Sequence, residues 1–189
     1  RQCGHARRPI AGFFNYPQKG GCGRPYFFNL MSDAASTIRE ELNEQWIPQI
    51  YQEKVRPMRT RSFKLEVPAR ENSPAIQFTL LGVELKVGRR RFACPDTGTA
   101  RYLAVFARAG CSSVAVPYDI TRLPEIASEL ESGWEAFEEA LSRHTSQATP
   151  QQRGKTRAAL IRKMRDEIAK YGSGELMPLF NTSTRQRDA

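Results

Sequence analysis

An apolar side chain recurs every three or four residues from Leu123 to Ser142, and this spacing is the strongest constraint on the fold. The series is Ile126, Leu130, Trp134, Phe137 and Leu141. A period of about 3.6 residues is that of an α-helix with one buried face. Pro124 suits the first turn, and the outer face carries six glutamates, the one acidic region of the chain. Such a helix must bury its apolar face against other elements, so the chain needs a core.

Residues 33–54 are expected to form another helix. Thr37 and Glu40 have the spacing of a capping box, and an apolar residue recurs at every fourth position, at Ile38, Leu42, Trp46 and Ile50. Pro48 lies inside this stretch, and we expect it to kink or end the helix, because proline lacks a backbone N–H.

Two further helices are predicted from their end signals. The first covers residues 99–109, with Asp96, Thr97 or Thr99 as its cap and Gly110 as its stop. The second opens at Thr149, Pro150 and Gln152 and runs to about Tyr171, where Gly172 ends it. Arginine and lysine crowd the outer face of this last helix.

Short strands are predicted between the helices, over residues 62–67, 76–81, 83–87 and 113–116, with 89–93 as a further candidate. Together these elements predict a mixed α/β (α+β) fold with a small central sheet in the order α-β-β-β-α-β, flanked by helices. We expect three parts along the chain. They are a basic, aromatic arm at 1–32, a core domain at 33–142, and a hinge, basic helix and tail at 143–189.

The chain is strongly basic. Its 189 residues include 29 Lys and Arg against 20 Asp and Glu, a formal net charge of +9. This excess suits a polyanionic partner, and nucleic acid is the predicted one, although an anionic membrane surface or an acidic protein also fits. No apolar run approaches the roughly 20 residues of a membrane span, which excludes a transmembrane helix. Four widely spaced cysteines are too few for a disulfide scaffold, so we expect a reducing, cytoplasmic location.

Glu84 and Lys86 are the candidate catalytic residues. They lie two apart on a predicted strand and therefore point to the same face. A carboxylate can hold Mg²⁺ while a neighbouring ammonium orients or activates a water. This pair therefore predicts metal-dependent phosphodiester cleavage, and a solvated strand face without chemistry is the alternative.

The order of elements over residues 33–118, with Glu-x-Lys on the third strand, resembles the core of the PD-(D/E)XK nucleases. The stretch from Val83 to Tyr118 is most similar to the archaeal Holliday-junction resolvases of that superfamily. These proteins follow the Glu-x-Lys strand with a short basic turn, a helix with an aliphatic-aromatic segment and a buried strand. The matching helical segment here is Val105, Phe106, Ala107 and Arg108.

The resemblance implies a Mg²⁺ site, with one departure from the family. The family holds its metal with an Asp on the preceding strand, the Glu of Glu-x-Lys and often a Glu on the first helix. No Asp lies between Asp33 and Asp96 in this chain, so Glu66 or Glu71 would have to join Glu84 as ligands. A nuclease-like fold that kept its nucleic-acid surface and lost its metal is the alternative.

Cys3, His5 and Cys22 form a second candidate metal group. Cysteine and histidine are the usual ligands of structural Zn²⁺, which takes four. The group is one ligand short, and Cys94 or Cys111 would complete it if the arm folds back. Burial as small apolar residues is the alternative role for these cysteines.

Several arginines are predicted to bind nucleic-acid phosphates. Three of them are adjacent and repel one another, which favours an anionic partner. The candidates are Arg89, Arg90 and Arg91 after the Glu84 strand, Arg59 and Arg61 before the sheet, and Arg157 and Arg162 on the last helix. Aromatic rings among the basic residues of the arm could stack on bases.

The sequence therefore predicts a nucleic-acid-binding protein on a nuclease-like core, with cleavage if Glu84 holds a metal. The alternative function is a non-enzymatic assembly or adaptor subunit that docks an acidic protein or a ribonucleoprotein. The acidic face of residues 123–142, set against the basic segments, also permits a homo-oligomer.

Overall fold

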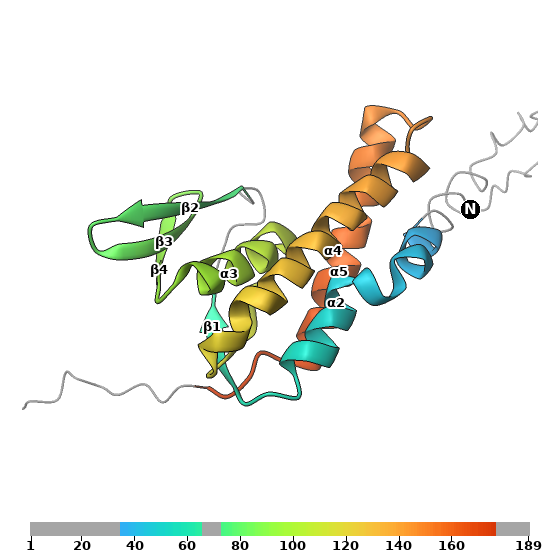
Figure 1. The fold of residues 1–189 in the computed structure, drawn as a ribbon. Helices are drawn as coiled ribbons and strands as arrows, with labels where there is room; N and C mark the ends of the chain where they lie inside the picture. The colour runs from blue at the N-terminus through green and yellow to red at the C-terminus, as the bar shows by residue number, and fades with distance from the viewer. Residues whose placement is uncertain (1–34, 66–72, 177–189) are drawn as a thin grey trace, which may run out of the picture.

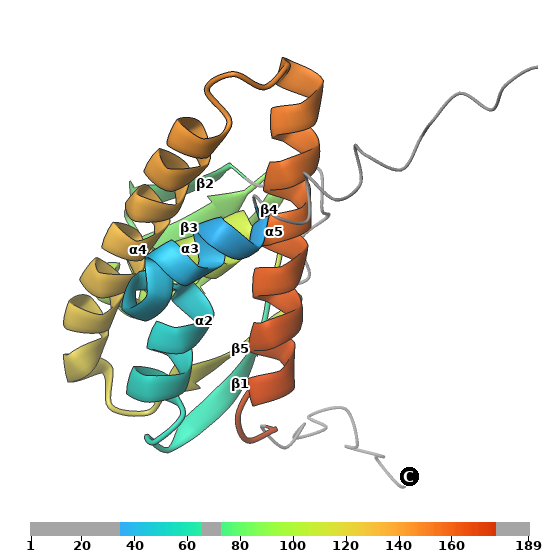
Figure 2. The ribbon, with the colours of Figure 1, turned by 90° about the vertical axis from the view of Figure 1, so that its right-hand side faces the viewer.

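Helix α3 (Thr97–Ala109) lies at the centre of the computed structural model, which describes residues 35–65 and 73–176. It packs against a small sheet on one side and against two long helices on the other (Figures 1 and 2). The backbone N–H and the hydroxyl of Thr99 both donate to the Asp96 carboxylate at 2.8 Å, which caps the helix. Gly110 ends it at a φ of 71°. Both predicted end signals are therefore confirmed.

The strands form two small antiparallel sheets instead of the predicted single central one. Three strands, β2 (Pro74–Thr79), β3 (Gly82–Val87) and β4 (Arg90–Cys94), form a meander. The other two strands, β1 (Thr60–Lys64) and β5 (Ser113–Pro117), pair only with each other. Four strands thus precede α3 along the chain, because the candidate strand near residues 89–93 is formed.

The sequence prediction joined β1 to the strands that follow it, and this pairing was wrong. β5 is apolar and buried over most of its length, so its backbone needs a partner inside the fold. β1 supplies that partner, with Phe63 opposite Val114 in the register. The two sheets meet where the rings of Phe63 and Phe92 lie 6.0 Å apart.

The predicted helix over 33–54 is broken into pieces. Residues 35–42 are helical, a 3₁₀ turn spans Asn43–Gln45, α2 spans Ile47–Ile50, and a π-helical turn spans Tyr51–Val55. The interruption falls at Trp46, which has an extended ψ of 118°. Pro48 lies in the first turn of the new helix, where a missing N–H leaves no hydrogen bond unmade.

Helices α4 (Leu123–His144) and α5 (Pro150–Tyr171) run antiparallel and diverge from the loop that joins them (Figure 2). The predicted start of α5 is confirmed, and Thr149 and Gln152 there exchange the hydrogen bonds of a capping box. Leu160, Met164 and Ile168 of α5 are buried in the same core as α3 and α4. Within the described residues, no helix combines the length and apolar character needed to cross a membrane.

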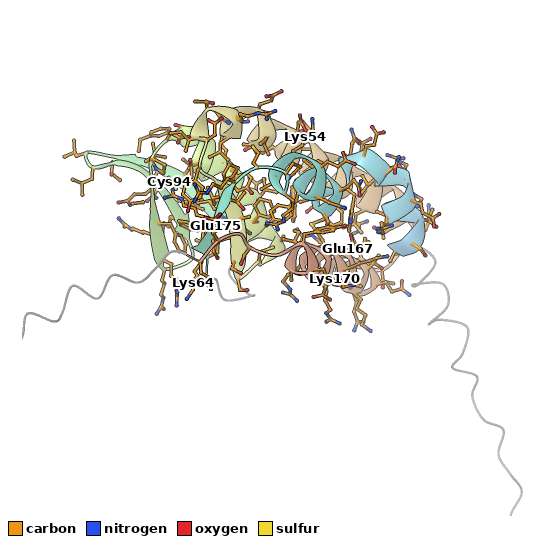
Figure 3. All side chains as sticks on the ribbon, turned by 90° about the horizontal axis from the view of Figure 1, so that it is seen from below. Lys54, Lys64, Cys94, Glu167, Lys170 and Glu175 are labelled. Carbon is orange, nitrogen blue, oxygen red and sulfur yellow. The ribbon has the colours of Figure 1, made fainter. Side chains whose placement is uncertain are left out.

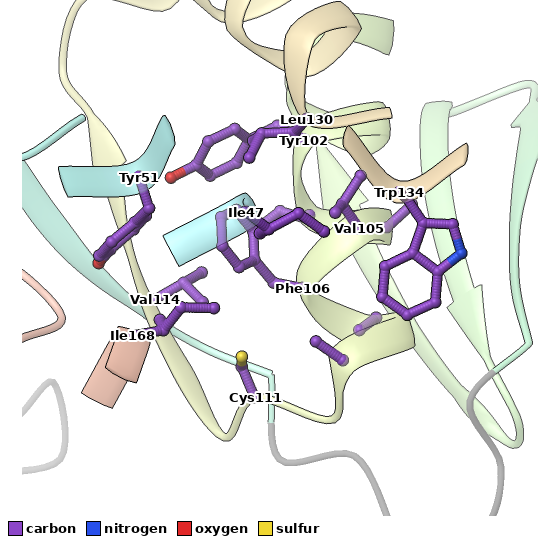
Figure 4. Packing of buried hydrophobic residues seen from close by; sticks show 14 of the residues in the cluster. Ile47, Tyr51, Tyr102, Val105, Phe106, Cys111, Val114, Leu130, Trp134 and Ile168 are labelled. Atoms are coloured by element: carbon purple, nitrogen blue, oxygen red, sulfur yellow. The ribbon is translucent and has the colours of Figure 1, made fainter. Parts of the chain in front are cut away.

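Three aromatic rings occupy the middle of the core (Figure 4). Phe106 of α3 lies 5.4 Å from the ring of Tyr51 and 4.9 Å from the ring of Tyr102. The Tyr51 hydroxyl donates to the Gly172 carbonyl at 2.6 Å and accepts from the Ala115 N–H at 3.0 Å. A single side chain thus connects β5 to the end of α5, and burial raises the pKa of the Tyr51 phenol.

Candidate nucleic-acid interface

Two adjoining cavities open between the end of α3, α4, α5 and the start of β2. The first has a volume of ≈ 430 Å³ and is lined by Ser73, Pro74, Arg108, Trp134 and Arg157. The second, of ≈ 370 Å³, is lined by Ala109, Gly154, Arg157, Ala158, Ile161, Arg162 and Arg165. Arg157 lines both, so the cavities adjoin at this side chain. We name them together the arginine groove, after Arg108, Arg157, Arg162 and Arg165.

Helix geometry brings these four arginines together from two elements. Arg108 stands in the last turn of α3, just before Gly110 ends that helix. Arg157 and Arg165 are eight residues apart on α5, which separates them by about 12 Å along the helix axis. The groove is therefore long enough for an extended anionic chain instead of one small anion.

Arg157 is held in place at the middle of the groove. Its guanidinium donates to Glu138 at 2.7 Å and lies 5.9 Å from the centroid of the Trp134 ring. Trp134 itself is buried, so its ring supports the arginine from beneath and offers little surface to a ligand. A planar guanidinium fixed in this way is suited to bidentate contact with phosphate.

The acidic helix predicted from the sequence is neutralised inside the molecule. Four of the six glutamates of α4 pair with basic side chains: Glu129 with Lys54, Glu131 with Arg101, Glu138 with Arg157, and Glu139 with Arg143. Three of these pairs join α4 to neighbouring segments and the fourth, Glu139 with Arg143, lies within α4, so these glutamates are paired within the chain. Helix α5 as a whole carries seven Lys and Arg against two acidic residues, and long side chains extend from it around Lys170 (Figure 3).

The predicted catalytic pair lies elsewhere, on the sheet face turned away from α3. Glu84 and Lys86 share that face of β3, while Leu85 and Val87 are buried on the opposite one. One carboxylate oxygen of Glu84 is buried, accepts no hydrogen bond from the described residues, and lies 3.7 Å from the Arg91 guanidinium. Arg91 is also opposite Lys86 in the register.

The described residues do not form a Mg²⁺ site around Glu84. A divalent cation needs several oxygen ligands, whereas this carboxylate has two cations, Lys86 and Arg91, beside it. Over residues 35–65 and 73–176, no group of three or more His, Cys, Asp or Glu could hold a metal ion. The other predicted ligands, Glu66 and Glu71, lie outside the described residues, so the Mg²⁺ prediction stays a prediction.

The predicted Zn²⁺ ligands Cys3, His5 and Cys22 also lie outside the described residues. The two cysteines that could complete such a site, Cys94 and Cys111, are both buried free thiols. Burial raises the pKa of the Cys111 thiol to about 12. Zinc binds the thiolate, and the surroundings of Cys111 disfavour that form.

The arginines predicted to bind phosphate fall into three places. Arg157 and Arg162 come together in the arginine groove. The run from Arg89 to Arg91 is exposed at the turn between β3 and β4. Arg59 and Arg61 lie on or beside β1, where Arg59 pairs with Glu175 at 3.3 Å and stacks over Tyr118. The side chain of Arg61 is partly buried, with an Nε that has no partner in the described structure.

Two groove residues were missed as site residues. Arg165 was one basic residue among many on its helix, and only its spacing from Arg157 distinguishes it. Arg108 belongs to a different helix, so no local pattern could place it in the groove. Comparisons with protein-family models, with curated proteins and with solved structures gave no match.

Proposed function

We propose that this protein binds nucleic acid, and that the arginine groove holds the phosphate backbone. The observation that supports the proposal most is the convergence of four arginines from α3 and α5 on two adjoining cavities. Phosphate contacts from arginine provide most of the affinity in non-specific nucleic-acid binding. Of the described residues, Glu138 is the one acidic side chain bonded to Arg157, and the described linings of the two cavities include four arginines and no acidic residue.

An acidic protein is the second candidate partner, as in an assembly or adaptor subunit. The pairing of the α4 glutamates inside the chain weakens the case for self-association through that face. The groove itself favours nucleic acid, because a chain of phosphates presents regularly spaced charges along an elongated cavity. An acidic peptide would have to match the arginine spacing by its own sequence.

Phosphodiester cleavage on a nuclease-like core remains a separate proposal. It rests on Glu84 and Lys86 and requires a further carboxylate from Glu66 or Glu71. The neighbouring Arg91 could contact a bound phosphate equally well without any cleavage. We therefore place binding first and make cleavage an additional readout of the same experiment.

The test is a titration of labelled DNA and RNA, single-stranded and duplex, against the double variant Arg162→Glu with Arg165→Glu. We expect binding at 100 mM salt to weaken by roughly a hundredfold, since two phosphate contacts become repulsive. The control reverses two arginines that do not line the groove, Arg56→Glu with Arg122→Glu, and changes the net charge equally. Incubation with Mg²⁺ or Mn²⁺ on the same substrates, beside Glu84→Gln, reports cleavage.

The comparison between the two double variants decides the proposal. If both weaken binding equally, net charge alone causes the affinity and the groove is not the site. Absence of binding by the wild-type protein at low salt would reject the nucleic-acid function and favour the adaptor.

A further inference from the structure

The hairpin between β2 and β3 ends in large apolar side chains that are mostly exposed. Phe78, Leu80 and Leu81 are 74%, 107% and 95% exposed. The hairpin projects from the body at the opposite end from helix 35–42 (Figures 1 and 3). We name these three residues the hairpin tip.

Turn formation does not account for the two leucines. Two-residue hairpin loops favour asparagine, aspartate and glycine, which adopt the required backbone angles easily. In this hairpin Gly82, with a φ of 122°, provides the unusual angle. The Thr79 hydroxyl accepts from the Leu81 N–H at 3.3 Å and donates to the Gly82 carbonyl at 3.1 Å. Polar residues at positions 80 and 81 would serve the same turn, so the leucines suit a partner.

The hairpin tip is also connected to the arginine groove through β2. Pro74, the first residue of β2, lines the groove, and Leu80 lies six residues further along the chain. At about 3.3 Å per strand residue, the tip therefore extends about 20 Å from the groove. The base of the sheet, beside Pro74, carries Lys86 and the basic turn from Arg89 to Arg91, and Glu84 is the single acidic residue of the three strands.

We propose that the hairpin tip is an apolar wedge that enters the base stack of duplex DNA held by the arginine groove. This inference rests on the proposed nucleic-acid function and adds the form of the substrate. Apolar side chains inserted between base steps unstack them and bend the duplex. A two-stranded ribbon fits the major groove of B-form DNA, whereas the major groove of an RNA duplex is too deep and narrow to admit one.

The charge arrangement favours DNA over a lipid surface as the partner. The basic groups lie at the base of the hairpin, where Lys86 is opposite Ala75 and Arg90 is opposite Val87, and four arginines line the adjoining groove. A flat anionic membrane could reach the tip but could not enter that groove at the same time. A bent duplex can contact both the groove and the tip.

The test compares a fully paired 20-base-pair DNA with the same DNA carrying one central mismatch and an adjacent 2-aminopurine. A mismatch lowers the cost of unstacking, so we expect the wild-type protein to bind it about tenfold more tightly and to raise the 2-aminopurine fluorescence. The variant Leu80→Ser with Leu81→Ser should lose the preference and the fluorescence change, while its binding to the paired duplex keeps its salt dependence. Leu176→Ser, which replaces another highly exposed leucine, should behave like the wild-type protein.

The outcomes separate this inference from the proposed function. If the wild-type protein binds no DNA, the proposed function fails and the wedge fails with it. If DNA binds but the tip variant keeps the mismatch preference, only the wedge is rejected. Tip-dependent flotation with anionic vesicles, tip-dependent dimerisation in light scattering, or equal tip dependence on an RNA duplex would each overturn the choice of DNA. Circular dichroism verifies that the variant remains folded.

Discussion

Gly133 lies where helix α4 passes closest to the 3₁₀ turn that precedes α2. A Cβ atom at this position would stand 2.6 Å from the Gln45 carbonyl oxygen and 3.1 Å from a methyl carbon of Ile50. The first contact is with backbone, which cannot rotate away. Glycine is therefore required at this position for packing.

A matched pair of glycine substitutions tests this close approach. We expect Gly133→Ala to lower the free energy of unfolding by about 1–3 kcal/mol through overpacking. Gly154→Ala, inside α5 with nothing within 4 Å of its Cβ, should raise it by about 0.5–1 kcal/mol. Urea denaturation followed by circular dichroism measures both. If both substitutions raise the free energy of unfolding equally, helix propensity alone determines the effect at position 133, and the close approach to Gln45 does not.

At the scale of elements, Tyr51 connects parts of the chain that are far apart in sequence. Its hydroxyl bonds the Ala115 N–H of β5 and the Gly172 carbonyl after α5. We expect Tyr51→Phe to leave two backbone groups without their partner and to lower the free energy of unfolding by about 1–3 kcal/mol. Tyr171→Phe is the control, because the Tyr171 ring packs against the core while its hydroxyl makes no hydrogen bond to the described residues, and this change should alter stability by less than about 0.5 kcal/mol. The same urea denaturation measures both variants. A Tyr51→Phe protein with the wild-type free energy of unfolding would show that this hydroxyl does not stabilise the fold.

Elements were predictable from the sequence where their signals are local. The cap at Asp96, the helix start at Thr149, Pro150 and Gln152, and the stop at Gly110 are each contained within a few residues, and all three are observed. Strand pairing is not a local property. β1 and β5 are separated by a whole sheet and a helix, so the alternation in β1 could not reveal its partner. The same limit applies to the site, since Arg157 and Arg162 share one helix whereas Arg108 comes from another.

Across the whole molecule, the N-terminal helical residues 35–42 cross the gap between α4 and α5 (Figure 2) and are held by charged groups at both ends. The Glu41 carboxylate is hydrogen-bonded to His144, with Oε2 and Nε2 2.6 Å apart, and also accepts from Arg143. Both partners lie at the end of α4. On the other side, Glu167 of α5 accepts from Arg39 at 3.2 Å and from the Trp46 indole at 2.6 Å. The paired carboxylates therefore fix the N-terminal helix to the α4–α5 pair.

The pH dependence of stability tests this attachment. The hydrogen bond from His144, with smaller contributions from Arg143, lowers the pKa of Glu41 below its usual 4.5. A carboxyl whose pKa is lowered by folding stabilises the folded state above its unfolded pKa, and this stabilisation is lost as the pH falls through the folded pKa. We expect the wild-type protein to melt at a higher temperature than Glu41→Gln at pH 6, and the difference to shrink below pH 4.5 and vanish near the lowered pKa. Glu40→Gln, on the same helix, controls for the loss of one charge. At about pH 2 the Glu41 carboxyl is protonated in the folded and in the unfolded protein. If the wild-type protein still melts above Glu41→Gln by the same margin at that pH, the shape of the Glu41 side chain, and not its charge, attaches the helix.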